Sequence, residues 1–475
     1  MNIFEKKELA KLEKTQLIDI IVIQAEQVKM LAGRVAELEA KANTNSGNSG
    51  KPPSSDGPGT PVGKNERERS GKSAGGQPGH EGRGLKLERS PDETVEHKAE
   101  VCGKCGAEIG DAGGSCVKSS NVIDVEIAVK IIRHEQMATQ CPMCGAANVG
   151  EMPREANHEM AYGTGLRALV VLLSNYGCVG MKKISGLLGD VFGVPISTGT
   201  VSNMNAGFAE RSEPVLREIR GRALAAPVIH ADETGMSVNG TQWWLHTAST
   251  EELTYITAHR KRGTEGIEAG GVVADYIGVV VHDFWAPYFK YDASTHAMCC
   301  AHLLRELKWV AENTKQTWAG EMATLLCEMK LAKENCQRDG QNALPECQAE
   351  QFAQKYAEIL GLGDIEAPYD YCSKKQHKSR NLLERFIDYM DEITRFAHHF
   401  IVPFTNNVAE RAIRNSKVKQ KVSGAFRSLH GIHDFAKISS IIGTAAKLGL
   451  SVFDSLKHIL AGDMLSLFSL ASATE

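Results

Sequence analysis

Two apolar, strand-like segments that each end in an acid limit most strongly what this chain can fold into. The first, "PVIHADE", ends in Asp232 and Glu233, and the second, "GVVVHDFWAPY", carries Asp283 directly after its apolar run. Between them lie two further strand-like segments, "TQWWLHTAST" and "LTYITAHR", and a helical stretch that contains glycine. Acids at the ends of buried strands cost desolvation free energy unless a cation meets them. These segments therefore predict an α/β fold with a sheet edge that needs positive charge.

Two interpretations of these acids are open. Asp232 could begin a turn through side-chain hydrogen bonds to the backbone. Alternatively, acids at two neighbouring strand ends and a third acid on a later helix converge and hold two divalent ions about 3.5–4 Å apart. Carboxylate ligands suit Mg²⁺ or Mn²⁺ because both ions prefer oxygen. The order of three strands, a helix and a strand is that of a ribonuclease H-like core, which we predict over residues 227–430 with a helical insertion at about 311–400.

Residues 1–42 predict one zipper-like, coiled-coil helix. Its seam repeats at spacings of four and three and consists of Leu17, Ile21, Gln24, Val28, Leu31, Val35 and Leu38. Such a heptad seam favours self-association, so we expect a homo-oligomer. A single amphipathic helix packed on its own domain is the alternative. Residues 43–97, rich in Gly, Ser and Pro and carrying several Lys and Arg, predict a flexible basic linker.

Residues 98–150 predict a zinc-binding module. They contain two C-x-x-C pairs, which are Cys102 and Cys105 in "CGKC" and Cys141 and Cys144 in "CPMC". The two-residue gap lets two thiolates from one tight turn face a single ion, and two such pairs complete a structural Zn²⁺ site. A β-hairpin over "SNVIDVEIAVKIIRHEQMATQ" could fill the spacing between the pairs. Unrelated turn cysteines are the alternative, and Cys116 or His134 could replace an unused thiol.

Residues 151–226 predict a helical, helix-turn-helix-like region. In "MKKISGLLGDVFGVPISTGTVSNMNAGFAE" a first helix is followed by a Gly-Val-Pro turn, and Ser197 stands where it would cap a second helix. The pattern is typical of DNA-binding helix-turn-helix proteins, although helices that simply pack together share it. Residues 431–475 predict a carboxy-terminal helical tail.

A locally basic helix follows the predicted insertion. The whole chain has a formal net charge of -4, but from Arg411 to His433 there are six Lys or Arg and no acid. A basic face matters more for nucleic-acid binding than the overall charge does. A solvated basic face is the alternative. We expect this helix to bind DNA phosphates through Arg411, Arg414, Lys417, Lys419 and Lys421.

Four blocks of the sequence resemble a known family. They are "HADETGMSVNGTQWWLHTAST", "HDFWAPY", "CCAHLLREL" and "TNNVAERAIRNSKVKQKVSGAFRS". Together with the linker motif "GGQPGHEGRG" and the paired cysteines, they resemble the bacterial insertion sequence 66 family transposases. The resemblance implies an Asp-Asp-Glu enzyme in which Asp232, Asp283 and Glu410 are catalytic and bind the Mg²⁺ ions. Cys300 is a departure, because the family motif has Asn at that place.

Several residues near these motifs have two interpretations. Glu233 is expected to be structural, because side chains alternate along a strand, and a role behind the metal ligands is the alternative. His302 and Arg305 either support the active site or are a core histidine and a surface arginine. We expect two tryptophans and two histidines to pack in the fold: Trp243, Trp244, His230 and His282. Base stacking is the alternative for the tryptophans, and contacts behind the metal ligands are the alternative for the histidines.

The resemblance implies a DNA transposase. Such an enzyme binds the terminal inverted repeats of its element, cleaves the 3′ strands and transfers them to target DNA by two-metal phosphodiester chemistry. The alternatives are a structure-specific nuclease on the same core and a zinc-containing DNA-binding regulator with an inactive core. Small accessory proteins encoded by the element are candidate partners. Because the charged start lacks a signal-peptide core and no apolar run has membrane-span length, we expect a cytoplasmic protein with no membrane partner.

Overall fold

The computed structural model describes seven parts of the chain: residues 13–42, 90–110, 115–125, 127–153, 161–372, 376–463 and 467–468. The chain divides into two units, of which one is Lys64–Arg133 and the other comprises the remaining residues. The predicted linker lies outside the described residues up to residue 89. Within the described parts, no helix has the length and apolar character that a membrane crossing requires.

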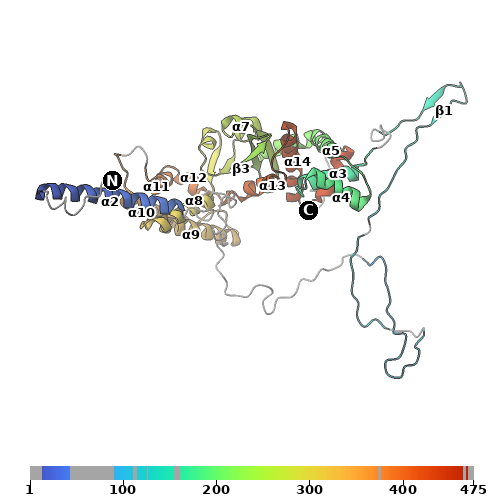
Figure 1. The fold of residues 1–475 in the computed structure, drawn as a ribbon, viewed down its shortest axis with the longest axis horizontal. Helices are drawn as coiled ribbons and strands as arrows, with labels where there is room; N and C mark the ends of the chain where they lie inside the picture. The colour runs from blue at the N-terminus through green and yellow to red at the C-terminus, as the bar shows by residue number, and fades with distance from the viewer. Residues whose placement is uncertain are drawn as a thin grey trace. The chain divides into compact units, whose positions relative to one another are not determined.

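Among the described residues, one mixed sheet has five strands in the order β5-β4-β3-β6-β7 (Figure 1). They are β3 (Val228–Val238), β4 (Thr241–Ser249), β5 (Thr254–His259), β6 (Val279–His282) and β7 (Thr295–Met298). Neighbours among β3, β4 and β5 are antiparallel, whereas β6 pairs in parallel with both β3 and β7. Asn239 and Gly240 join β3 to β4 with φ of 46° and 75°, the backbone of a tight two-residue hairpin. This sheet is compatible with the predicted ribonuclease H-like core.

Short helices connect β5 to β6 and β6 to β7, and long helices follow the sheet. The connections are α7 (Thr264–Gly270), η3 (Val273–Asp275) and η4 (Ala286–Lys290). After β7 come α8 (Cys300–Asn313), α9 (Trp318–Arg338), α10 (Glu346–Glu366), α11 (Lys378–Asp388), α12 (Met390–His398) and α13 (Asn407–Ser423). Leu303 of α8, Trp318 of α9 and Phe386 of α11 belong to one buried apolar cluster. The helices between α8 and α13 thus have a core that they share with α8.

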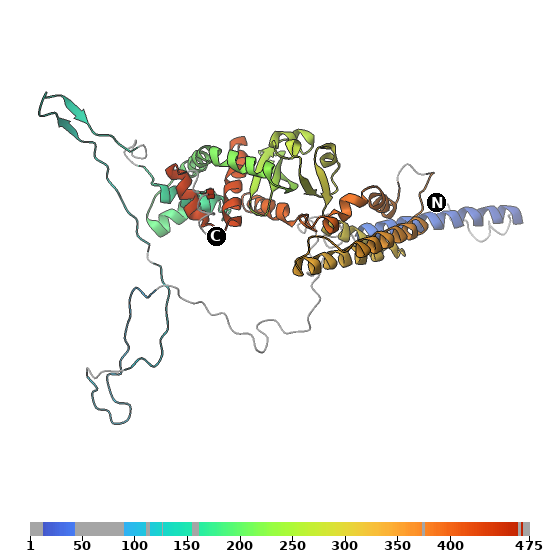
Figure 2. The same ribbon diagram turned by 180° about the vertical axis from the view of Figure 1, so that it is seen from behind.

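In the described part of the chain, six further helices lie before and after the strands: α3 (Thr164–Asn175), α4 (Met181–Phe192), α5 (Thr198–Arg211), α6 (Glu213–Ala225), α14 (Leu429–Lys447) and α15 (Val452–Ala461). All of them except α4 contribute to a buried cluster with the sheet, and α4 packs on α3 and α5. Ser197 caps α5, since its hydroxyl accepts from the Thr200 N–H at 3.0 Å. One buried cluster joins Phe208 of α5, Ile229 of β3 and Ile441 of α14, and both ribbon views show α5 beside α14 (Figures 1 and 2). We predicted domain boundaries at residues 226 and 430, and this buried cluster includes residues from both sides of each boundary.

The amino-terminal helix exposes its apolar seam, and the described part of the cysteine-rich segment contains one two-stranded sheet. Helix α2 (Lys14–Ala42) is continuous, and more than half of the surface of each of these seam residues is exposed: Ile21, Val28, Leu31, Val35 and Leu38. Strands β1 (Ala138–Gln140) and β2 (Ala147–Val149) pair antiparallel around the second cysteine pair. Residues 115–125 and 127–137 contain no strand. The hairpin that we expected to fill the spacing before this pair is therefore wrong for the described residues.

Candidate functional site

Parallel pairing between β3 and β6 brings Asp232 and Asp283 to neighbouring positions. The register aligns His230 with Val281, so Asp232 and Asp283, two residues further along each chain, come opposite each other. Strand β6 ends directly before Asp283, whose Oδ1 accepts a hydrogen bond from the Trp285 backbone N–H at 3.1 Å. Asp283 thus directly follows the carboxyl end of β6, whereas Asp232 lies within β3, which continues to Val238. The expectation that Asp232 ends its strand is therefore wrong, although the two acids still come from adjacent strands.

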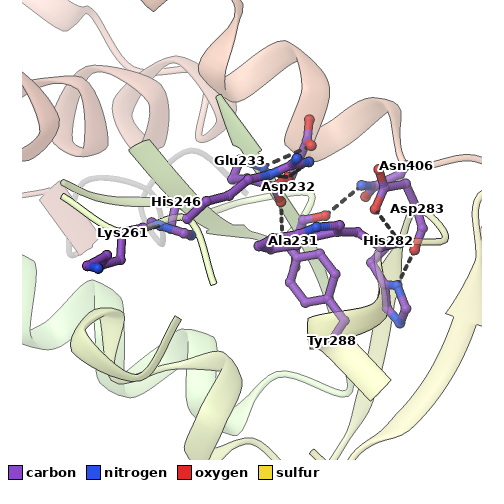
Figure 3. A network of polar contacts seen from close by, with 11 residues as sticks. Ala231, Asp232, Glu233, His246, Lys261, His282, Asp283, Tyr288 and Asn406 are labelled. Atoms are coloured by element: carbon purple, nitrogen blue, oxygen red, sulfur yellow. Dashed lines mark hydrogen bonds and ion pairs between the residues drawn. The ribbon is translucent and has the colours of Figure 1, made fainter. Parts of the chain in front are cut away.

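Asn406 ties the start of α13 to β3 (Figure 3). Its Nδ2 donates to the Ala231 carbonyl at 2.7 Å, and its Oδ1 accepts from His230 Nδ1 at 3.0 Å. Burial lowers the pKa of His230 to about 4, so the ring is neutral and its Nδ1–H is the donor. Because Ala231 directly precedes Asp232, these bonds fix the first turn of α13 beside that acid. Glu410 lies in this first turn.

The carboxylates of this region repel one another. Burial raises the pKa of Asp232 well above its ordinary range, and the charges of Glu233, Asp283 and Glu410 raise it further. Burial likewise raises the pKa of Asp283, although the positive charge of His302 opposes this. Half-buried carboxylates in mutual repulsion favour a bound cation. Carboxylate oxygens are the ligand type that hard divalent ions such as Mg²⁺ or Mn²⁺ prefer.

The repulsion predicts how the stability of the metal-free protein depends on pH. The ordinary pKa of an aspartate is 3.8, and the pKa of Asp232 in the folded chain is higher. Between these two pKa values the folded state binds a proton that the unfolded state has lost. The Asp232 contribution to stability therefore falls as pH rises from about 4 through the folded pKa. In a chelating buffer, Asp232→Asn should raise the melting temperature near neutral pH and lose this advantage below pH 4. Thermal unfolding followed by circular dichroism measures both, and equal melting temperatures throughout would contradict the expectation.

Glu233, which Figure 3 labels together with Tyr288, is anchored by Tyr288 and Arg262. Arg262 donates to Oε1 through Nη2 at 2.6 Å and Nε at 3.0 Å, and the Tyr288 hydroxyl donates to Oε2 at 2.7 Å. The Arg262 guanidinium lies 4.9 Å from the Trp244 ring centre and 4.3 Å from that of Trp285. Glu233 thus makes a structural ion pair, and its charge also acts on Asp232. Sequence reasoning missed Arg262, because its partners come from three separate segments.

Among the described residues, one group of at least three ligand-type side chains has its ligand atoms close enough to share a metal ion, and it includes Glu410. Cys299, His302 and Glu410 each offer one atom, and these atoms all lie within 4.8 Å of one another. His302 Nδ1 is 3.7 Å from Glu410 Oε1, and within the described part of the chain neither buried atom has a hydrogen-bond partner. Burial alone would lower the pKa of His302, but a hydrogen bond to Cys299 and the Glu410 charge raise it to about 9. His302 therefore lies in the acidic site and not in an apolar core.

The predicted DNA-binding residues of α13 have different surroundings. Arg411, Arg414 and Lys421 are exposed. Lys417 is exposed as well, but its Nζ donates to a backbone carbonyl of β3 at 2.6 Å. Lys419 is buried, and its Nζ donates to a carbonyl of α3 at 2.7 Å. Lys419 therefore holds α13 against α3, and the exposed charge of this helix belongs mainly to the other residues.

Each cysteine pair forms a tight turn of the same geometry. The Cys102 N–H donates to Ala107 O at 2.8 Å and the Gly106 N–H donates to Cys102 O at 2.9 Å; the turn at Cys141 repeats both bonds at 2.8 Å. Gly106 and Gly145 have φ of 74° and 73°, which glycine adopts without strain. Backbone N–H groups within each turn lower the pKa of Cys102 and of Cys141. These turns favour the thiolate that a metal requires.

Two family models match this sequence, and one of them covers most of the residues that the structure describes. A model described as "Transposase IS66 family" matches residues 159–434, which include the five-stranded sheet, the inserted helices and all three acids. A second model, a family of unknown function (DUF6444), matches residues 5–86. No curated protein matches the chain.

Proposed function

Because the chain belongs to the IS66 family of transposases, we propose that it cuts and joins DNA at the ends of its own element through Asp232, Asp283 and Glu410. The observation that carries this proposal is the placement of the mutually repelling, half-buried Asp232 and Asp283 on and directly after the adjacent strands β3 and β6, with Glu410 in the first turn of α13. Carboxylates grouped in this way favour divalent ions together with a phosphate-bearing substrate. The reaction proposed is cleavage of the 3′ strands followed by their transfer to target DNA.

The protein side chains have separate tasks in this proposal. Asp232, Asp283 and Glu410 would hold two Mg²⁺ or Mn²⁺ ions, which supply charge stabilisation and an activated water or 3′-hydroxyl. Asn406 holds the Glu410 helix against β3, so that the third ligand stays beside the first. The Trp285 N–H fixes the orientation of the Asp283 carboxylate.

Strand joining on plasmid DNA tests this function. Purified protein, DNA carrying the terminal inverted repeats of the element and Mg²⁺ should give products in which the cut 3′ ends are linked to the plasmid. A structure-specific nuclease would give cut ends but no linked product. A DNA-binding regulator would give neither, so each alternative predicts a different gel. Cleavage without any joining, over a range of metal and protein concentrations, would refute the transposase mechanism proposed here.

The exposed arginines of α13 are proposed to contact DNA phosphates. Arg414→Ala should weaken binding and reduce the slope of log affinity against log salt concentration by about one unit, because one phosphate contact is lost. Lys457→Ala on α15 is the matched control, since that lysine pairs with Asp454 of its own helix. Fluorescence anisotropy with labelled end DNA at several salt concentrations measures the slope. If both variants keep the wild-type slope, this face of α13 is a solvated surface.

The cysteine pairs are proposed to hold one structural Zn²⁺ through Cys102, Cys105, Cys141 and Cys144. The similar turns and lowered thiol pKa values support each pair as a ligand source. Cys102→Ser and Cys141→Ser should each lower the zinc content by one ion per chain, measured by elemental analysis. Cys116→Ser, which changes an exposed cysteine outside the pairs, should leave it unchanged. Loss of zinc in only one of the first two variants would show that the pairs do not share an ion.

A further inference from the structure

We propose that Cys299, His302 and Glu410 form a binding site for one borderline divalent transition-metal ion, with Zn²⁺ the best match. This ion is distinct from the oxygen-bound ions of the proposed reaction and from the zinc of the cysteine pairs. The three ligand atoms lie within 4.8 Å of one another. Because the site includes Glu410, its consequence for cleavage rests on the proposed function, whereas the binding itself does not.

Two helix beginnings build this site. Cys299 is the residue before α8, and His302 follows it by three positions, so both side chains share one face of the first turn. Glu410 lies in the first turn of α13. The Asn406 N–H donates to Cys299 Sγ at 3.1 Å, and this bond joins the two helix beginnings. The three ligands are thus presented by ordered backbone before any ion binds.

Two of the three ligand atoms at this site have no hydrogen-bond partner among the described residues. His302 Nδ1 and Glu410 Oε1 are buried, and no hydrogen bond reaches either atom from the described part of the chain. Their separation of 3.7 Å is longer than a hydrogen bond. With a pKa of about 9, His302 is protonated near neutral pH and makes only an ion pair with Glu410 across this distance. One divalent ion between the two atoms would displace that proton and be bound by both. The Asn406 N–H on Cys299 Sγ is the kind of outer contact that orients a metal-bound thiolate.

The ligand types select the ion. A thiolate and an imidazole favour Zn²⁺ or Co²⁺, whereas Mg²⁺ prefers oxygen ligands. Three protein ligands leave the fourth tetrahedral position open, as in zinc sites that exchange a water. An ion bound here uses the Glu410 carboxylate, which the proposed reaction also needs. We therefore expect Zn²⁺ to inhibit cleavage that Mg²⁺ supports.

Cys300 provides a matched control beside the site. Its thiol is buried and donates to the Met298 and Ile393 carbonyls, so it is engaged away from the cluster. Cys300→Ser changes the same atom type one residue away. Cys299→Ser leaves an oxygen that can accept the Asn406 N–H, which limits the effect on folding. His302→Gln changes the second ligand independently, and melting temperatures identify any variant that fails to fold.

Cobalt binding tests the site in the full-length protein with zinc already bound at its cysteine pairs. Co²⁺ should bind once more per chain in equilibrium dialysis and give a thiolate-to-cobalt absorption band. Cys299→Ser should remove that band, His302→Gln should weaken Co²⁺ binding at least about 10-fold, and Cys300→Ser should change neither. Equal Co²⁺ affinity and an unchanged band in both ligand variants would overturn the proposal. If Cys299→Ser does not fold, the result for His302→Gln decides.

A second measurement separates this proposal from the proposed function. Each protein is assayed for cleavage in Mg²⁺ with increasing Zn²⁺, and the rates are compared with its own zinc-free rate. His302→Gln should need at least about 10-fold more Zn²⁺ for half inhibition than the wild type does. Co²⁺ binding without any cleavage in Mg²⁺ would count against the proposed function alone. Cleavage in Mg²⁺ without Co²⁺ binding would overturn the metal site alone.

Discussion

Replacing Asp232 or Asp283 by Asn, or Glu410 by Gln, should lower strand cleavage in Mg²⁺ by roughly 1,000-fold or more. The ions that these residues would hold contribute several kcal/mol to stabilisation of the transition state. Each ~1.4 kcal/mol corresponds to a tenfold change in rate, so losing one ligand charge has an effect of this size. Each replacement keeps the shape of the side chain and removes one negative charge, so folding and end binding should remain.

The measurement is the initial rate of cleavage of labelled end DNA, with end binding followed by anisotropy in the same samples. Asp292→Asn is the matched control, because Asp292 is an exposed acid in the turn between η4 and β7. It should cleave at the wild-type rate. A triad variant that binds DNA and cleaves within about tenfold of that rate would remove its residue from the proposed triad.

Local sequence patterns predicted much of the fold. Asp232 and Asp283 each follow an apolar run, and strands β3 and β6 occupy those runs in parallel register. Helix α13 begins at Asn407, within the "TNNVAER" block that pointed to Glu410. The resemblance to insertion sequence 66 transposases is confirmed over residues 159–434. These features are predictable because each depends on residues close together in the chain.

Features that depend on distant contacts could not be read from the sequence. Lys419 belongs to a run of basic residues, but it is buried, and it donates a hydrogen bond to an α3 carbonyl that lies far away in the sequence. Asn406 stands in a motif that we had singled out, and only the fold shows that it bonds to Ala231. Arg262 had no signal, since its anion and both rings lie on other elements. Charge and apolar patterns predict elements, whereas these roles follow from packing.

Deletion of residues 1–45 should abolish self-association of the chain. In α2 the apolar seam residues Ile21, Val28 and Leu31 are each more than half exposed, so the helix gains apolar burial only from a partner. Gln24 on the same seam would lower stability and favour one register of a paired helix. The truncated protein should sediment at the mass of one chain, while the full-length protein sediments at a multiple of it.

A single substitution makes this test more specific. Leu31→Glu places a charge on the seam, whereas Ile23→Glu places one at an exposed apolar position outside it. Only Leu31→Glu should dissociate the protein. Joint capture of two DNA ends should then fall by roughly 100-fold or more, because linking two binding modules gains at least that much, whereas binding of one end should persist. If Leu31→Glu sediments and captures paired ends as the wild type does, α2 packs on its own subunit and does not pair.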